Sequence, residues 1–330
     1  MSELLCSVII VTWNRRKELE LAIDSILAQT IAAKLEVIVV DNGSTDGTVE
    51  WLQTAYDDRL RLFQFAENRG ACHGRNAGIH LARAKHICFL DSDALILELH
   101  TLETCLKALN TEPAIRAVAV PIWFDRARTR PFCLGGYITP HGYFFPHRSF
   151  TETEDPDMIS SCFAVWEKGM LMELRGFDPW FFWGIEDMDL ALRARWNALR
   201  GAPAGTQFRI IMDGAVLHEM SQGGRHFKPG DFLPSFHAFE RQRLRLVMGY
   251  GGLREFFKVL ILSVLQREQI ARDAWMKRMT RREWFWALLA YPAIRLFYLP
   301  IDAFKQRQNH LESTPVPITV RDSANPSVRR

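Results

Sequence analysis

The chain has 330 residues, of which 48% are hydrophobic and 24% charged, and its formal net charge is +3. These values are typical of a globular protein, and they exclude a chain that is disordered or membrane-embedded throughout. The length suffices for one large α/β domain with a smaller addition. The charge is uneven, because residues 241–310 contain 14 Lys and Arg but only 5 Asp and Glu, whereas residues 1–240 are net acidic. We therefore expect these two parts to meet different partners.

The six cysteines are scattered along the chain without close pairs. Their spacing predicts neither a zinc cluster nor a disulfide framework, and several lie in apolar runs, where cysteine behaves as a small hydrophobic residue. The N-terminal segment MSELL has no basic region and no long apolar stretch. It is therefore not expected to be a secretory signal, and a reducing cytoplasm is the expected location.

The first 90 residues alternate between short apolar runs and amphipathic segments. The runs CSVIIVT and LEVIVV are β-branched and continuously apolar, as in strands that are buried on both faces of a parallel sheet. The expected strands are 6–12, 35–40, 60–65 and one that ends at Leu90. The expected helices are 15–28, with Asn14 as its N-cap, one after the polar turn at 41–47, and 70–84. This alternation over short connections predicts an α/β fold with a doubly wound, mostly parallel sheet.

The middle of the chain is less regular. A helix is expected at 101–110 and a strand at 115–121, but residues 125–157 are rich in Pro, Gly and aromatic residues without a clear period. Such a stretch is more typical of a binding loop than of a simple connection. The elements expected after it are a strand at 159–166, a short helix at 168–174, a helix from the acid cluster at 186–189 to about Leu199, and a last sheet strand at 208–212.

The composition changes at about residue 236 to Arg, Leu, Phe and Trp at helical spacing. The most apolar stretch, 284–301, is interrupted by Pro292 and Arg295, so a helix in the membrane interface is favoured over a spanning one. The alternative is a solvated face of a helix bundle or dimer. Nucleic-acid binding is not expected, because no recognised motif accompanies the charge. The expected domains are an α/β domain at 1–235, a basic amphipathic helical extension at 236–310 and a disordered tail at 311–330.

Two carboxylates separated by one residue, Asp91 and Asp93, follow the apolar run that ends at Leu90. The carboxyl ends of strands are where open α/β sheets bind ligands, and paired acids there favour a hard divalent metal that bridges to phosphate. This DXD triplet is weak evidence alone, because the same pattern occurs at 155–157 and 187–189. No GxGxxG follows the first strand and no GxxxxGK[ST] occurs, so dinucleotide-binding and P-loop folds lose their main support.

Other segments give the triplet a context. In chain order they are the first strand with Thr12 and Asn14, VVDNGSTDGT at 39–48, NRGACHGRNAG at 68–78, FLDSDA at 89–94, GFDPWFFWGIEDMDLALR at 176–193, and His218. In order and spacing they resemble the inverting family-2 glycosyltransferases, which have the GT-A fold, over roughly residues 6–245. The 176–193 segment is most similar to the subgroup that includes many rhamnosyltransferases. The chain departs from the family pattern at SSCFAVWEK, 160–168, which lies where relatives shape the donor-sugar pocket.

The resemblance implies a donor-nucleotide site at the first strand ends. Asp41 matches the acid that accepts a hydrogen bond from the imide N–H of a pyrimidine base, and Thr12 and Asn14 would line the same pocket. A turn-capping role suits Asp41 equally well. Arg75 either faces the nucleotide and its phosphates or is a solvated helix arginine, and the sequence leaves the two open.

The resemblance also implies a metal site. Asp91 would face the ribose and metal-bound water, Asp93 would ligate the metal directly, and His218 matches the third protein ligand. The expected cofactor is Mn²⁺ or Mg²⁺, which as a Lewis acid stabilises the charge on a diphosphate leaving group. An imidazole ligand favours Mn²⁺ somewhat. The alternative is a structural role for His218.

The acceptor side is expected at the acid cluster of residues 186–189. By resemblance Asp187 is the general base, which takes the proton of the acceptor hydroxyl, and Glu186 a neighbour that binds the acceptor. Acids in the first turn of a helix are also favoured by the helix dipole whatever their function, so the basicity of Asp187 stays open. Trp180 and Trp183 would stack on acceptor sugars or lipid, or else belong to the core.

Together these features predict a metal-dependent inverting glycosyltransferase. It would move a sugar from a UDP- or dTDP-linked donor to a hydroxyl of a glycan or lipid-linked glycan in cell-surface polysaccharide synthesis. The basic extension would contact an anionic membrane surface, which makes the protein peripheral on the cytoplasmic face of the cell membrane. The alternatives are a nucleotidyltransferase and a catalytically silent sugar-nucleotide-binding scaffold. Assembly into a homo-oligomer is left open.

Overall fold

The computed structural model describes residues 3–56, 60–138, 144–147, 156–179, 181, 185–199 and 207–218. The chain divides into two compact units, and nearly all of the described elements belong to the first, which includes residues 1–137 and 145–221. The predicted boundary at 235/236, the helical extension and the tail at 311–330 lie outside the described residues. Among the residues that are described, no helix is both long enough and apolar enough to cross a membrane.

A seven-stranded sheet forms the centre of this unit, with the strand order β12-β6-β11-β4-β1-β2-β3. All neighbours pair in parallel except β11, which runs antiparallel to both β4 and β6. Its strands are β1 (Cys6–Thr12), β2 (Leu35–Asp41), β3 (Arg61–Gln64), β4 (His86–Leu90), β6 (Ile115–Ala119), β11 (Phe163–Glu167) and β12 (Gln207–Ile210). The mostly parallel α/β sheet predicted from the apolar runs is therefore confirmed.

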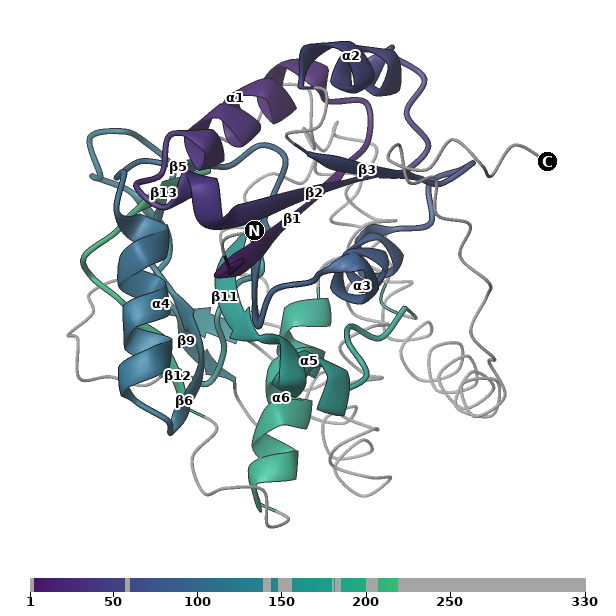
Figure 1. Cartoon of the computed structure of the whole chain (residues 1–330). Helices are drawn as coiled ribbons and strands as arrows, with labels where there is room; N and C mark the ends of the chain where they lie inside the picture. The colour runs from purple at the N-terminus through teal and green to yellow at the C-terminus, as the bar shows by residue number, and fades with distance from the viewer. Residues whose placement is uncertain are drawn as a thin grey trace, which may run out of the picture. The chain divides into compact units, whose positions relative to one another are not determined.

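Helices pack on both faces of this sheet. Figure 1 shows α1 and α2 along one side of β1, β2 and β3, with α3 on the other. The helices are α1 (Arg16–Leu27), α2 (Thr48–Ala55), α3 (Ala71–Leu81), α4 (Thr101–Thr111), α5 (Lys168–Glu173) and α6 (Glu186–Leu199), with a short 3₁₀ turn, η1 (Ala32–Lys34). Helix α3 lies close to β1, and its glycines make this approach possible. A Cβ on Gly74 would lie 2.5 Å from Val11 Cγ1, and one on Gly78 would lie 2.4 Å from Ile9 Cγ2.

Two small sheets complete the described structure. A four-stranded sheet has the order β5-β13-β7-β8, and a two-stranded sheet joins β9 and β10. Their strands are β5 (Leu95–Ile96), β7 (Ile122–Trp123), β8 (Pro131–Cys133), β9 (Gly136–Ile138), β10 (Phe144–Pro146) and β13 (Val216–Leu217). The strand at 208–212 is thus not the last one, and the segment 125–157 contains short strands. Both were hidden in the sequence because strands of two or three residues are too short to show a period.

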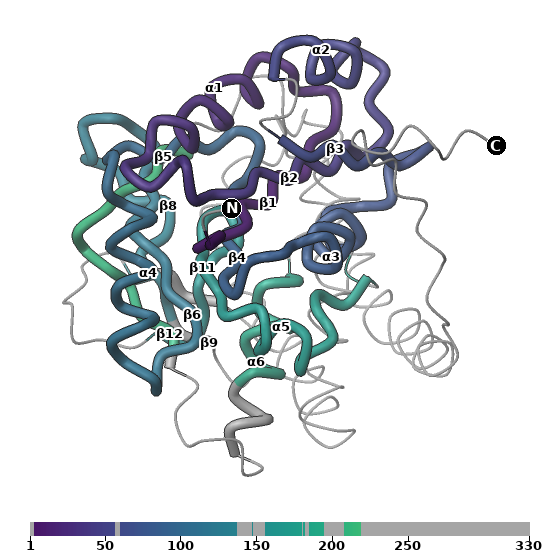
Figure 2. Tube along the Cα trace, viewed as in Figure 1, coloured from purple at the N-terminus to yellow at the C-terminus, as the bar shows by residue number. Residues whose placement is uncertain are grey.

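The direction of each strand decides which loops meet. Strands β1, β2 and β4 end at one edge of the sheet, here called the carboxyl edge, and the antiparallel strand β11 begins there. Figure 2 traces β4 beside β11. The segment that precedes β11 therefore lies next to the segment that follows β4, as the hydrogen bond from the N–H of Asp91 to the carbonyl of Cys162 shows (2.9 Å). Residues that are distant in sequence are gathered at this edge.

The prediction that Asn14 caps α1 is wrong. The N-cap position is occupied by Arg15, without a side-chain cap, and Asn14 adopts a left-handed conformation with φ 52°. Its side-chain oxygen accepts a hydrogen bond from the N–H of Thr45 (2.7 Å), and its own N–H donates to Ser44 Oγ (2.9 Å). Asn14 thus joins the loops after β1 and β2 instead of starting the helix.

Candidate active site

Two buried polar atoms without a hydrogen-bond partner lie at the ends of β1 and β2. Thr12 and Asp41 are paired across these strands, and each is at most 1% exposed. One carboxylate oxygen of Asp41 accepts the N–H groups of Gly43 (3.1 Å) and Ser44 (3.0 Å). The other, Oδ1, and the hydroxyl of Thr12 have no partner. Asp41 therefore caps its turn, which is the alternative role that the sequence offered. Its Oδ1 can still accept a hydrogen bond from a donor group of a ligand.

Burial raises the pKa of Asp41, although the N–H groups of the turn partly offset this effect. The turn itself depends on a glycine, because Gly43 has φ 78° and a Cβ there would lie 2.7 Å from the Cα of Glu67. A buried acceptor without a donor destabilises the folded state by about 1–3 kcal/mol. A ligand that donates a hydrogen bond to Asp41 would remove that cost.

The carboxylate of Asp93 lies between the side chains of Arg15 and His218. One oxygen of Asp93 forms an ion pair with Arg15, and the other lies 3.2 Å from Nε2 of His218. Burial alone would raise the pKa of Asp93, but His218 and Arg15 lower it to about 2. Asp93 is therefore ionised at neutral pH. His218 itself directly follows β13, and its ring makes a T-shaped contact with the ring of Phe132 at a centroid distance of 4.8 Å.

Asp91, Cys162 and His218 form a group of candidate metal ligands. A carboxylate oxygen, the thiol sulfur and a ring nitrogen, one from each residue, all lie within 4.8 Å of one another. Since Asp93 also reaches His218, the edge offers two carboxylates and an imidazole in one place. Carboxylates and imidazole suit Mn²⁺, and carboxylates suit Mg²⁺. The donor set therefore fits a divalent cation.

Arg75 is a buried cation between acidic side chains, which excludes the solvated-arginine alternative. The residue is 7% exposed. Its guanidinium donates to Asp91 (3.1 Å) and to Glu186 (3.1 Å) and lies over the ring of Phe177. Burial alone would lower the pKa of Arg75, but the two carboxylates raise it, so the guanidinium stays charged. It links the end of β4 to the start of α6.

Asp187 is held at the start of α6 by a serine from the segment that precedes β11. The hydroxyl of Ser161 donates to one oxygen of Asp187 (2.5 Å), and the N–H of Ser161 donates to the other (3.1 Å). Burial, followed by the charge of Glu186, raises the pKa of Asp187 to about 6, while Arg75 and Ser161 act against this rise. The opposing effects that the sequence left open thus sum to a raised pKa, which suits a group that takes up a proton near neutral pH.

Reciprocal hydrogen bonds fix the segment that leads into α6. The side-chain oxygen of Asn76 on α3 accepts the N–H of Phe177 (2.8 Å), and its amide donates to the carbonyl of Phe177 (2.7 Å). On the other side of the turn, Arg193 of α6 donates to the carbonyl of Gly176 (2.8 Å). The position of the acid pair at 186–187 is therefore determined by α3 as well as by its own helix.

The structure brings nearly all of the predicted site residues to one edge of the sheet. Thr12, Asn14 and Asp41 lie at the ends of β1 and β2, whereas the ion pairs and short distances above connect Arg75, Asp91, Asp93, Glu186, Asp187 and His218. Trp180 and Trp183 lie outside the described residues, so their stacking stays a prediction.

Three residues of this edge were missed from the sequence. Arg15 could have been predicted, because it directly follows Asn14, which was assigned to the end of the first strand. Ser161 and Cys162 were noted only as part of the segment 160–168 that departs from the family pattern, and no role was predicted for either; they precede β11, whose antiparallel direction places them at the carboxyl edge.

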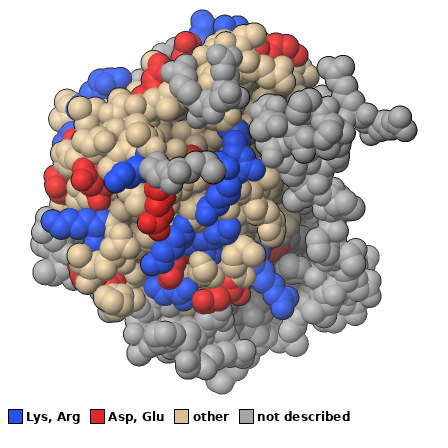
Figure 3. Space-filling view, in the orientation of Figure 1, with Lys and Arg blue, Asp and Glu red and all other residues tan. Residues whose placement is uncertain are grey.

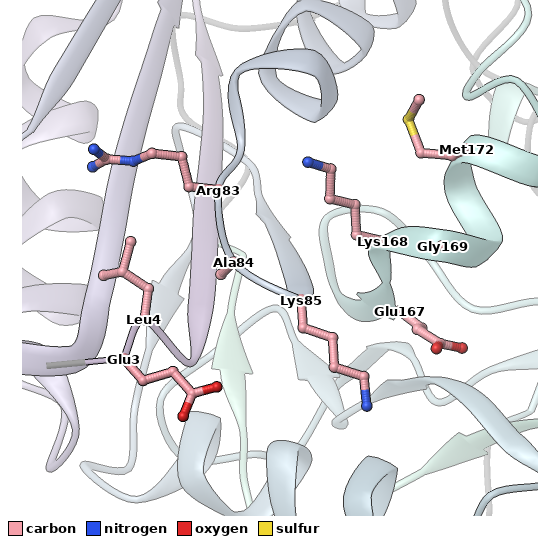
Figure 4. Close-up of a pocket in the computed structure, with 9 residues that line it drawn as sticks. All are labelled: Glu3, Leu4, Arg83, Ala84, Lys85, Glu167, Lys168, Gly169 and Met172. Carbon is pink, nitrogen blue, oxygen red and sulfur yellow. The ribbon is translucent and has the colours of Figure 1, made fainter.

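A groove of about 1070 Å³ lies at the opposite edge, near the beginnings of β1 and β4. Figure 4 shows Arg83, Lys85 and Lys168 around it, together with Glu3 and Glu167. Its charges are of both signs, as they are across the face seen in Figure 3, and Lys168 is held by the carbonyl of Ala82 (2.6 Å). Since the strand-end acids lie at the other edge, this groove is not the candidate site.

Comparison with known proteins agrees with the geometry. Residues 7–174 match the family model described as Glycosyl transferase family 2. The chain is 34% identical over 116 residues to glycosyltransferase GlyG of Streptococcus pneumoniae, a match that covers 34% of this chain and 38% of that protein. It is 38% identical over 91 residues to the putative teichuronic acid biosynthesis glycosyltransferase TuaG of Bacillus subtilis, covering 27% of this chain and 36% of that protein. The chain thus spans well under half the length of these relatives.

Among solved structures, the chain is similar to a mannosyltransferase, PcManGT from Pyrobaculum calidifontis, in complex with GDP-Man and Mn²⁺. The TM-score is 0.52 at 19% sequence identity, and the alignment covers 94% of this chain and 86% of the other. The likeness confirms the predicted GT-A fold.

Proposed function

The chain belongs to glycosyl transferase family 2, and we propose that it moves a sugar from a UDP- or dTDP-linked donor to a hydroxyl of a glycan or lipid-linked glycan, with a divalent metal and with inversion. One observation carries this proposal. The carboxyl edge of a single sheet holds an unpartnered acceptor at Asp41, an acid and imidazole set at Asp91, Asp93 and His218, and a half-buried carboxylate of raised pKa at Asp187.

Asp41 and Thr12 would bind the base of the donor. The imide N–H of uracil or thymine is a donor that the free Oδ1 of Asp41 can accept, and the hydroxyl of Thr12 can serve a neighbouring carbonyl. Hydrogen bonds with Ser44 and Thr45 hold Asn14 in the loop that follows β1, near Thr12. Replacing the imide by a group that only accepts would leave two acceptors facing each other, so binding should select for the imide.

Asp91, Asp93 and His218 would hold Mn²⁺ or Mg²⁺. When bound, the metal supplies Lewis-acid stabilisation of the charge that develops on the departing diphosphate. The residues contribute the ligand atoms, and Asp93 is already ionised because its pKa is lowered to about 2. An imidazole in the set favours Mn²⁺ over Mg²⁺, and Mn²⁺ is the ion in the complex of the structurally similar mannosyltransferase.

Asp187 would act as the general base. As the acceptor hydroxyl oxygen forms a bond to the anomeric carbon, its proton passes to a carboxylate oxygen of Asp187, and the bond from the anomeric carbon to the diphosphate oxygen breaks with its electron pair. Glu186 directly precedes Asp187 and is held by an ion pair with Arg75. From this place it would position the acceptor. A single displacement with one base and no covalent intermediate inverts the configuration at the anomeric carbon.

Cell-surface polysaccharide synthesis is the proposed setting. It is supported by the matched putative teichuronic acid biosynthesis glycosyltransferase and by the succinoglycan biosynthesis protein ExoO of Rhizobium meliloti, to which the chain is 40% identical over 85 residues. The resemblance of residues 176–193 to the rhamnosyltransferase subgroup, a prediction from the sequence alone, makes a deoxysugar donor the first to test. Stacking of acceptor sugars by Trp180 and Trp183, and peripheral binding of residues 236–310 to the cytoplasmic face of the membrane, belong to the same proposal.

A thermal-shift screen of sugar nucleotides with Mn²⁺ tests the proposal. A donor at 100 times its Kd stabilises the fold by about 2.7 kcal/mol, which raises the Tm of a domain of this size by several degrees. UDP- or dTDP-sugars should produce the shift, and Asp41→Asn should abolish it because an amide N–H then faces the imide N–H. A shift with purine sugar nucleotides alone, or no shift with any, would contradict the proposed donor.

A further inference from the structure

The thiol of Cys162 lies among side chains that suit a metal. Its sulfur, a carboxylate oxygen of Asp91 and a ring nitrogen of His218 lie within 4.8 Å of one another. Cys162 is 3% exposed, and its carbonyl accepts the N–H of Asp91 (2.9 Å), which ties the two backbones together. Within the part of the chain that the structure describes, no other group of three or more His, Cys, Asp and Glu side chains meets this distance.

A set of one sulfur, one nitrogen and one oxygen differs in preference from a set of carboxylates and imidazole. Zn²⁺ binds thiolate at about 2.3 Å and imidazole or carboxylate at about 2.0–2.2 Å. In a tetrahedral site these bond lengths place the ligand atoms about 3.3–3.8 Å apart, so a side-chain movement of about 1 Å closes the group. Hard cations such as Mg²⁺ gain little from a thiol, whereas zinc gains strongly.

We propose that Asp91, Cys162 and His218 form a zinc site that overlaps the site for the catalytic metal, so that Zn²⁺ displaces Mn²⁺ or Mg²⁺ and stops transfer. On binding, the Cys162 thiol releases its proton to solvent and the thiolate sulfur bonds to zinc, with no change in oxidation state. Three protein ligands leave the fourth tetrahedral position to solvent. The inhibition rests on the proposed function, but the zinc binding does not.

Cobalt gives a readout that is independent of activity, because Co²⁺ bound to a thiolate shows a sulfur-to-metal charge-transfer absorption. The full chain, without donor, is titrated with Co²⁺ and then with Zn²⁺. We expect the charge-transfer band to appear with Co²⁺ and to vanish as Zn²⁺ replaces it. Competition with a colorimetric zinc indicator gives the zinc affinity.

Cys162→Ser should lose the band and weaken zinc binding at least about tenfold, yet keep a Tm increase with Mn²⁺. The matched control is Cys105→Ser, which removes an equally buried thiol from α4 and should keep both signals. If Cys162→Ser does not fold, His218→Gln, which retains the thiol, should also weaken zinc binding. A band or a zinc affinity that is unchanged in these variants overturns the site.

The two proposals fail separately. Zinc binding that depends on Cys162, in a chain that releases no nucleoside diphosphate from any sugar nucleotide, would uphold the zinc site and contradict the proposed transfer. Metal-dependent transfer that micromolar Zn²⁺ leaves unchanged would overturn the inhibition and leave the proposed function intact.

Discussion

Replacing Ser161 with alanine should raise the pKa of Asp187 further and shift the pH dependence of turnover. The substitution removes the hydroxyl that donates to Asp187 (2.5 Å) but keeps the backbone N–H that donates to its other oxygen (3.1 Å). A hydrogen bond to a charged group contributes about 1.5–3 kcal/mol. Since one pKa unit corresponds to about 1.36 kcal/mol, the loss raises the pKa by about 1–2 units from its present value of about 6.

Initial rates of nucleoside diphosphate release, measured from pH 5 to 9 at saturating donor and metal, give this shift directly. The wild-type rate should rise with pH through a midpoint near the Asp187 pKa of about 6. In Ser161→Ala the midpoint should move to about 7–8, so the rate at pH 6 falls about 5- to 50-fold while the alkaline plateau is kept.

Ser160→Ala is the matched control, because its hydroxyl accepts the N–H of Cys162 (3.2 Å). Its midpoint should stay with that of the wild type. The reasoning is refuted if Ser161→Ala keeps the wild-type midpoint, or if Asp187→Asn retains turnover.

Three further predictions concern stability. Gly74→Ala places a Cβ 2.5 Å from a methyl carbon of β1 and should lower the free energy of unfolding by about 1–3 kcal/mol. Gly169→Ala in α5 should not lower it, because the nearest atoms outside the local helix backbone, on Arg116 and Glu167, are 4.0 Å from the added Cβ. Equal losses in the two variants would contradict the close packing of α3. Arg75→Met removes the cation that two carboxylates share and should cost about 3 kcal/mol, seen as a Tm drop that Arg75→Lys only partly restores. Because the pKa of Asp187 is raised in the folded state from 3.8 to about 6, its ionisation destabilises the fold as pH rises through that range. Asp187→Asn should therefore stabilise the protein by up to about 3 kcal/mol at pH 8 and little at pH 4, and denaturation curves with no such difference would contradict the raised pKa of Asp187.

The strand-end acids could be predicted because the strands before them are long, apolar and parallel. Asp41 and Asp91 each follow a continuous buried run, and parallel strands bring such residues to the same edge. The sequence also placed Glu186 and Asp187 in the first turn of a helix, as the structure has them. Local pattern was sufficient wherever the position of a residue follows from its own element.

Pairing between distant segments could not be predicted. Asn14 was expected to cap its own helix, but it bonds with residues 44 and 45 across the sheet edge. Arg75 lies on α3, whose glycines let the helix approach β1 closely, and its partners are the residue that follows β4 and the first residue of α6. Ser161 and Cys162 reach the site only because β11 runs antiparallel. The periodicity of hydrophobic residues does not indicate whether a strand is parallel or antiparallel to its neighbours.

The most direct test of the account is the release of UDP or dTDP from sugar nucleotides by the purified protein, with and without Mn²⁺, in the wild type and in Asp93→Ala. We predict release that requires the metal and is lost in Asp93→Ala, while the variant retains a cooperative thermal transition. Release that persists in Asp93→Ala or after removal of divalent metal by EDTA, or no release from any sugar nucleotide, would contradict metal-dependent sugar transfer at the carboxyl edge of the sheet.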